Sequence, residues 1–119
     1  MQFDWREYLN LAQSLAQSTY CFNQEAAFRC ATSRAYYAAF CYARNYARDK
    51  QDFSPTYKSE DHRLIRKHFK GKGMCKIVRF LENLRQWRND CDYDDIVPNV
   101  SLLAKNAINE AQKLINILP

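Results

Sequence analysis

Apolar residues recur at spacings of three and four along most of the chain, which is the pattern of amphipathic helices. One such stripe lies within residues 3–19 and consists of Trp5, Tyr8, Leu9, Ala12, Leu15 and Ala16. A second begins after Asn23, which can cap a helix, and continues to about residue 50. Its apolar positions are mostly small: Ala27, Ala31, Ala35, Ala38 and Tyr42. Because alanines allow close approach between helix axes, we expect two long helices in tight contact.

Helix-breaking residues divide the second half of the chain. Residues 51–58 contain Pro55 and form a loop, after which Ser59 opens a short basic helix that ends at Gly71 and Gly73. A fourth helix covers about residues 74–91 and extends at most one further turn beyond them. Pro98 and Asn99 precede the last apolar stripe, which is made of Val100, Leu103, Ala107, Ala111, Leu114 and Leu118. No segment alternates as a strand would. The prediction is therefore an all-α, mostly antiparallel up-and-down bundle of four long helices plus a short basic helix, with residues 1–119 as one domain.

Composition narrows the class of protein. Of the 119 residues, 47% are hydrophobic and 26% are charged, which is typical of a globular chain. No apolar run approaches the roughly 20 residues that span a bilayer, and the first residues lack a signal-peptide core. The five cysteines, whose spacings do not suit a metal site, are expected to be reduced and partly buried: Cys21, Cys30, Cys41, Cys75 and Cys91. We expect a cytoplasmic protein with no metal, no cofactor and no membrane partner.

The fourth helix directs a charged residue at its own packing face. Its apolar ladder of Ile77, Leu81 and Leu84 continues, at the same spacing, to Arg88 and Cys91. An arginine is rarely buried without a partner or a purpose. Four aspartates, at positions 90, 92, 94 and 95, follow near the helix C-terminus, where the helix dipole disfavours anions. We therefore expect other groups to stabilise this end of the helix.

Charge is distributed unevenly along the chain. Residues 58–88 contain ten Lys or Arg against three acids, a local balance of +7, whereas residues 90–95 carry −4. A basic surface of this kind suits a phosphate-rich partner such as RNA, with Arg63, Arg66 and Lys67 as candidate RNA-binding residues. It is equally consistent with an ordinary solvated helix face.

Two segments together carry a resemblance. Residues 33–40 read SRAYYAAF, and residues 88–94 read RNDCDYD. In that order, and about fifty residues apart, they resemble the HEPN superfamily, in particular its small stand-alone bacterial and archaeal members. The resemblance implies a helical bundle that dimerises around a two-fold axis. Many such proteins are metal-independent ribonucleases with an Arg-x4–6-His motif, and the motifs of both protomers face one cleft. They use the 2′-hydroxyl of the RNA and leave a cyclic phosphate.

The family motif can be placed on this chain residue by residue. The resemblance implies that Arg88, Asn89 and Tyr93 are the candidate catalytic residues, with Tyr93 at the position of the usual histidine. Histidine titrates near neutrality, whereas tyrosine ordinarily titrates near 10 and is a poor base at pH 7. The neighbouring aspartates also disfavour a tyrosinate anion. Tyr93 is therefore better suited to donate a hydrogen bond or a proton to phosphate. The two histidines, His62 and His68, are expected to be surface residues without a catalytic role.

A structural interpretation of the same residues stays open. Arg88 and Asp92 are spaced to form an i,i+4 ion pair, and Arg34 could reach across the bundle to the aspartates. With Ser33 and Tyr37, these residues would form a structural polar network. Tyr36, Tyr37 and Phe40 would then be core aromatics whose hydroxyls that network satisfies.

Three functions remain open at this point. The first is an RNA-cleaving HEPN protein of a toxin–antitoxin or defence system, acting as a homodimer. The second is a non-catalytic HEPN module that binds RNA or a nucleotide. The third is a protein-interaction domain whose partner, as the resemblance implies, is a minimal nucleotidyltransferase antitoxin.

Overall fold

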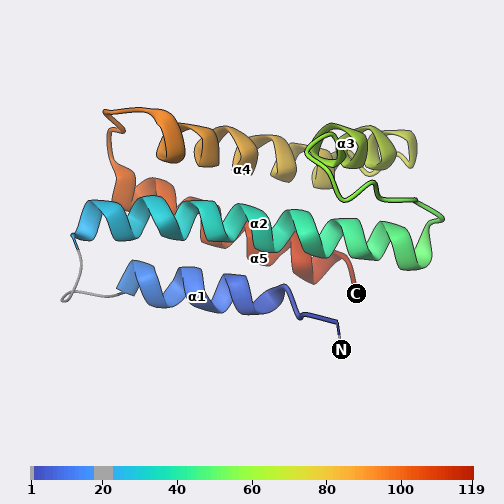
Figure 1. Ribbon diagram of the computed structural model, residues 1–119, viewed down its shortest axis with the longest axis horizontal. Coiled ribbons are helices and arrows are strands. Elements are labelled where there is room, and N and C mark those ends of the chain that lie inside the picture. Colours follow the sequence, from blue (N-terminus) through green and yellow to red (C-terminus); the bar gives the residue numbers. More distant parts are fainter. Residues whose placement is uncertain (1, 18–22) are drawn as a thin grey trace.

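The computed structural model describes residues 2–17 and 23–119, and these residues fold into five helices without a strand (Figure 1). In chain order they are α1 (Arg6–Gln17), α2 (Gln24–Lys50), α3 (Asp61–Gly71), α4 (Cys75–Tyr93) and α5 (Val100–Ile117). The four longer helices alternate in direction along the chain, and short α3 lies across one end of the bundle (Figure 1). The all-α, up-and-down prediction is confirmed.

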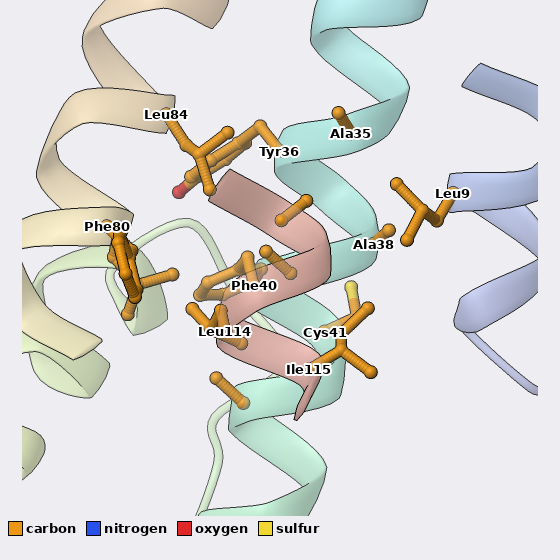
Figure 2. Packing of buried hydrophobic residues seen from close by; sticks show 14 of the residues in the cluster. Leu9, Ala35, Tyr36, Ala38, Phe40, Cys41, Phe80, Leu84, Leu114 and Ile115 are labelled. Atoms are coloured by element: carbon orange, nitrogen blue, oxygen red, sulfur yellow. The ribbon is translucent and has the colours of Figure 1, made fainter. Parts of the chain in front are cut away.

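Helix α2 is the central element, because it packs against each of the other four helices. Seven of its alanines are buried, which lets its neighbours come close: Ala27, Ala31, Ala35, Ala38, Ala39, Ala43 and Ala47. Its larger buried side chains, Tyr36 and Phe40, lie among residues of α4 and α5 (Figure 2). Burial of a large apolar side chain contributes about 1.5–3 kcal/mol. Burial of the side chains that face α4 therefore both stabilises the bundle and fixes the position of that helix.

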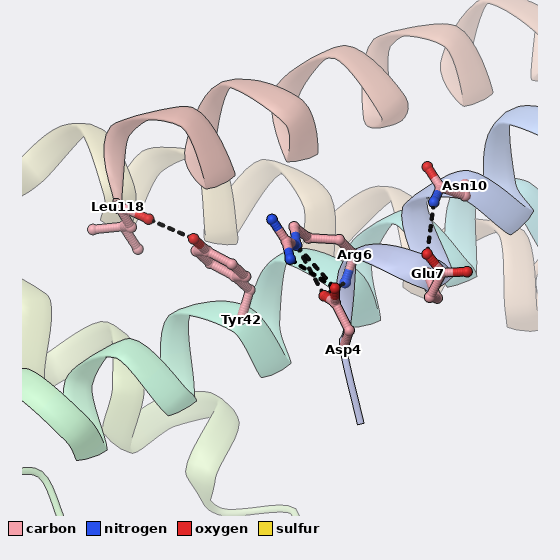
Figure 3. Close-up of polar contacts among 6 residues, drawn as sticks. All are labelled: Asp4, Arg6, Glu7, Asn10, Tyr42 and Leu118. Carbon is pink, nitrogen blue, oxygen red and sulfur yellow. Dashed lines mark hydrogen bonds and ion pairs between the residues drawn. The ribbon is translucent and has the colours of Figure 1, made fainter. Parts of the chain in front are cut away.

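Local capping sets the beginnings of α1 and α2. Helix α1 begins at Arg6 rather than at the predicted residue 3, because the Asp4 carboxylate accepts hydrogen bonds from the Arg6 backbone N–H and guanidinium (Figure 3). Its predicted end at residue 19 lies outside the described residues. Helix α2 begins as predicted, since Asn23 Oδ1 accepts from the Ala26 N–H at 3.1 Å.

Helix α3 begins at Asp61, two residues after the predicted start. The Asp61 side chain is only 1% exposed and accepts hydrogen bonds from the Thr56 and Tyr57 N–H groups and from the Thr56 hydroxyl. Burial alone would raise the pKa of Asp61, but these hydrogen bonds outweigh it and hold the pKa below its usual value. The loop before α3 is thereby fixed to the first turn of that helix.

The remaining boundaries follow the predicted breakers. Helix α3 ends at Gly71, and Gly73 has a φ of 73°, in the region that glycine adopts without strain. Helix α4 extends two residues beyond the predicted Cys91. At the end of the chain, the Tyr42 hydroxyl donates to the Leu118 carbonyl at 2.7 Å and ties α5 to α2 (Figure 3).

The cysteine prediction needs a partial correction. Cys41 and Cys91 are buried free thiols, but Cys30 and Cys75 are exposed because they lie on the outer faces of their helices. Cys21 lies outside the described residues. Within the described part of the chain, no helix combines the length and the apolar character that crossing a membrane requires.

Candidate anion-binding site

Arg88 lies where the ladder on α4 predicts, against the packing face. Its side chain is only 12% exposed. The guanidinium carbon lies 5.4 Å from the ring centre of Tyr36 and 5.6 Å from that of Tyr37. One terminal nitrogen forms the predicted ion pair with Asp92, at 3.5 Å. The Arg88 Nε is buried and has no hydrogen-bond partner. No other buried side-chain nitrogen or oxygen of the described residues lacks one. Arg88 therefore retains hydrogen-bonding capacity and charge that the fold does not satisfy.

Arg34 does not reach the aspartates. Its guanidinium lies over the rings of Tyr8 at 4.9 Å and Tyr37 at 5.2 Å, and one nitrogen lies 3.4 Å from the hydroxyl of buried Ser33. Tyr37 thus lies against both Arg34 and Arg88. An aromatic face therefore lies between the two arginines, where carboxylates were expected.

Arg29, which sequence reasoning missed, stabilises the aspartate-rich end of α4. Its terminal nitrogens donate to the backbone carbonyls of Cys91, Asp94 and Asp95, at 2.9, 2.6 and 3.1 Å. These are carbonyls at and beyond the helix C-terminus, where a cation is favoured by the helix dipole. Its Nε pairs with Glu25, which lies one turn earlier on α2. The sequence holds no signal for this contact, because 62 or more residues separate Arg29 from the carbonyls.

His62 contradicts the prediction that both histidines are surface residues. Its ring is half-buried and stacks on Phe40, with ring centres 4.1 Å apart and planes inclined by 10°. The Tyr36 hydroxyl forms a short hydrogen bond with His62 Nδ1. The sequence did hold a signal for the burial of His62. His62, Ile65 and Phe69 follow the i, i+3, i+7 spacing of one helix face, and the last two are buried.

The surroundings of His62 keep it neutral. Burial, followed by the nearby charges of Arg88, Arg85 and Arg66, lowers the pKa of His62 to about 4. Burial also raises the pKa of the Tyr36 phenol, so that hydroxyl keeps its proton at neutral pH. Because a phenol hydroxyl is a stronger hydrogen-bond donor than a neutral imidazole N–H, we assign the donor role to Tyr36 and the proton of the neutral imidazole to Nε2. His68 is also half-buried, with Nε2 2.9 Å from the Gln51 side-chain oxygen.

Of the other predicted site residues, Arg66 lies beside His62, whereas Tyr93, Arg63 and Lys67 are exposed. Tyr93 is 75% exposed, and it follows Arg88 by five residues, which places the two about 140° apart around a helix. Asn89 is half-buried on α4, and Arg63 and Lys67 are exposed on α3. Arg66 is half-buried and donates to the His62 backbone carbonyl at 2.8 Å. One protomer thus brings Arg88, Arg66 and His62 together, but not Arg88 and Tyr93.

Two surface hollows of the described residues lie away from Arg88 and His62. One lies beside Trp5 and Tyr46, and another lies between α1 and α5. Within residues 2–17 and 23–119, no three His, Cys, Asp or Glu side chains are grouped so that they could share a metal ion. The chemistry that the described site offers is therefore that of cationic hydrogen-bond donors beside a neutral imidazole.

The bundle and this cluster define an α-helical protein that presents a partly buried arginine and further cations at one face. The sequence matches the HEPN domain family over residues 6–119, so the chain belongs to that family. Comparison with curated proteins and with solved structures gave no significant match.

Proposed function

We propose that this HEPN protein targets RNA and that Arg88 is the residue through which it engages phosphate. The observation that carries the proposal is the unsatisfied guanidinium of Arg88, which is held on two aromatic rings with Nε unpaired. An arginine fixed in this way has already lost much of its rotamer freedom, so less entropy is lost when it binds an anion.

The charge around Arg88 supports the same ligand. Arg85 and Arg66 are close enough to lower the pKa of the same histidine, and exposed Arg63 and Lys67 continue the basic surface along α3. Arginine and lysine that contact phosphates supply the sequence-independent part of RNA affinity.

In its catalytic form, the proposal is metal-independent cleavage by a homodimer of a toxin–antitoxin or defence system. Arg88, Asn89 and Tyr93 of both copies would face one cleft. The 2′-oxygen of RNA would attack the adjacent phosphorus and lose its proton. The 5′-oxygen would leave and gain a proton, so the products are a 2′,3′-cyclic phosphate and a 5′-hydroxyl. Arg88 would stabilise the charge that develops on the phosphoryl oxygens. The proposed protein partner is a minimal nucleotidyltransferase antitoxin.

A second form, binding of RNA or nucleotide without cleavage, is favoured by the position of Tyr93. That side chain is 75% exposed, and the five-residue spacing places it about 140° from Arg88 around α4. In the catalytic form, a second copy would bring it to the phosphate that Arg88 holds. If no such arrangement forms, the site retains binding alone.

RNA binding and cleavage measured on one set of variants test both forms. Purified protein is mixed with a labelled single-stranded RNA in the presence of a metal chelator, and binding and product formation are followed. We expect salt-dependent binding that Arg88→Ala weakens by about tenfold or more, the scale of a lost charge-assisted hydrogen bond. The matched control is Lys105→Gln, which removes one positive charge from α5 on another face.

The outcomes separate the alternatives. Cleavage by the wild type that Arg88→Ala abolishes supports the nuclease form, and binding without products supports the binding form. Absence of RNA binding at low salt would overturn the proposal and favour the nucleotidyltransferase as the principal partner.

A further inference from the structure

We propose that His62, Arg66, Arg85 and Arg88 form a phosphate-binding site within one protomer, in which His62 Nε2–H donates to a phosphate oxygen. The inference rests on the proposed function, because it names the ligand group and the residues that hold it. It differs from the catalytic form of that function because the site is formed by α3 and α4 of one protomer and needs no second copy.

Cations from two packed helices converge on His62. Arg85 and Arg88 are spaced i,i+3 on α4, which places them on adjoining parts of one face. Arg66 lies one turn after His62 on α3, and α3 packs against α4. The charges of all three arginines lower the pKa of His62, and Arg85 also lowers that of half-buried Arg66 after burial itself. The geometry agrees, because Arg88 lies over the ring of Tyr36, whose hydroxyl bonds His62, and Arg66 binds the His62 carbonyl. A bound anion would relieve the repulsion among these cations.

Nearby carboxylates do not neutralise the cluster. Asp61 is already engaged with the loop before α3, through Thr56 and Tyr57. Glu82 is exposed and raises the pKa of Arg66 only as a minor influence. Asp92 is the one acidic side chain paired with Arg88 in the described residues, and that pair is long, at 3.5 Å. The cluster keeps an excess of positive charge.

His62 adds a neutral donor of fixed orientation. Its Nδ1 accepts from Tyr36, which is itself only 1% exposed, so the imidazole proton is held on Nε2. Nε2 has no hydrogen bond to any described residue, and it is not among the buried atoms without a partner, so it reaches solvent. Stacking on Phe40 fixes the plane of the ring. A donor oriented in this way can meet a ligand without reorganising.

The chemistry of these groups fits a phosphate oxyanion. Guanidinium forks match the paired oxygens of a phosphate group, and several such forks suit its distributed charge. An RNA phosphodiester and the terminal phosphate of a nucleotide share this chemistry. Both are therefore candidates for the same site.

The test is an NMR titration of the His62 ring with three probes. These are a deoxydinucleotide with a single phosphodiester, a nucleoside monophosphate, and the corresponding nucleoside without phosphate. The deoxy sugar prevents cleavage through a 2′-hydroxyl. We expect a phosphate-bearing probe to raise the pKa of His62 by about one pH unit, because an anion within hydrogen-bond reach favours imidazolium. The nucleoside should leave it unchanged. His68, on another side of α3, is the internal reference, and His62→Gln assigns the signals.

Variants connect the response to the cluster. Arg66→Gln and Arg85→Gln should each weaken phosphate binding by about tenfold, whereas Lys105→Gln should leave it within twofold. Circular dichroism verifies that each variant is folded. A response to the phosphodiester identifies a polynucleotide backbone as the source, and a response to the monophosphate alone identifies a nucleotide.

Failure of this inference is distinguishable from failure of the proposed function. If neither phosphate probe moves the His62 signal while Arg88→Ala still weakens RNA binding, the site is overturned and RNA targeting stands. If the phosphate probes move it but RNA does not bind, the site is upheld and RNA targeting fails.

Discussion

An arginine held by aromatic rings differs physically from one held by carboxylates. Arg88 lies against the rings of Tyr36 and Tyr37, which attract the cation through their faces but cannot accept its N–H groups as carboxylates do. Its charge is stabilised, while its ion pair with Asp92 is long, at 3.5 Å, and its buried Nε has no hydrogen-bond partner. A lysine at this position would lose both the planar contact and the fork of donors. This combination is why we regard Arg88 as a site residue.

His62 should make the folded protein sensitive to acid. In the folded state its pKa is lowered to about 4, chiefly by burial, whereas in the unfolded chain it returns to about 6.5. Above pH 6.5 both states are neutral, and the group has no influence on stability. Between pH 6.5 and 4 only the unfolded chain binds the proton, so stability falls across that window. Urea unfolding at pH 7 and pH 5 should show a larger loss in the wild type than in His62→Gln.

The two proteins should therefore become closer in stability as the pH falls. At pH 7, His62→Gln loses the hydrogen bond from buried Tyr36 and the stacking on Phe40. At pH 5, part of that difference is offset because the variant has no imidazole to protonate. Equal losses in both proteins would contradict a depressed pKa at His62.

Tyr93 tests whether the family motif still acts in this chain. If its hydroxyl orients phosphate or donates a proton, Tyr93→Phe should lower RNA turnover by roughly tenfold or more. Tyr93→His introduces a group that titrates near neutrality and should raise turnover. Because the side chain is 75% exposed, neither change should disturb the fold. Rates for the three proteins on one RNA substrate give the answer, and identical turnover in all of them would remove Tyr93 from the site.

Single residues were predictable where they continue a local period. The ladder of Ile77, Leu81 and Leu84 indicated the position of Arg88, and the structure confirms it. The partner of Arg88 was less accessible, because the choice between carboxylates and aromatic rings depends on how α2 and α4 meet. His62 was misassigned because its basic neighbours suggested a solvated helix, although its spacing from Ile65 placed it on the buried side.

At the level of elements, α4 ends in a way that its own sequence does not favour. Four aspartates lie near its C-terminus, yet the helix continues to Tyr93. Arg29 compensates from α2, because its guanidinium binds three carbonyls at and beyond the end of the helix. The same contact ties α2 to the C-terminal end of α4, just beyond Arg88.

Removal of the Arg29 cap should loosen this end of α4. Arg29→Ala leaves the carbonyls of Cys91, Asp94 and Asp95 without this donor, at a cost of about 1–3 kcal/mol. We expect the melting temperature to fall by several degrees. Arg6→Ala is the matched control, because its ion pair with Asp4 is exposed and worth little. Similar melting temperatures for Arg29→Ala and the control would contradict a capping role.

Element boundaries were predictable to the extent that caps are local. Asn23 and the glycines after α3 were readable from sequence because they act within a few residues. The start of α1 was missed by three residues because Asp4 forms its cap from inside the predicted helix. The start of α3 was missed because Asp61 binds backward to Thr56 and Tyr57. In these cases a polar side chain competed with helical propensity.

For the whole molecule, two exposed residues beside the motif bear on assembly. Tyr93 is 75% exposed, and Ile96, just after α4, is 85% exposed. A two-fold dimer would juxtapose such a surface with its own copy. It would also bring Tyr93 of one protomer toward the motif of the other.

We therefore predict a homodimer with the end of α4 at its interface. Light scattering of the pure protein should give about twice the 14.1 kDa of one chain. Ile96→Asp should shift the population toward the monomer, because it places a charge where apolar surface would be buried. Ile117→Asp is the matched control, since Ile117 is also exposed, at 42%, but lies near the end of α5.

The same variant separates the two forms of the proposed function. If cleavage needs motifs from both copies, Ile96→Asp should abolish turnover together with the dimer, while the phosphate response of His62 remains because that site is formed within one protomer. A wild-type protein that stays monomeric at high micromolar concentration would overturn the shared cleft. RNA targeting would then rest on the cations of α3 and α4 alone, where Arg66, Arg85 and Arg88 of one protomer all lower the pKa of His62.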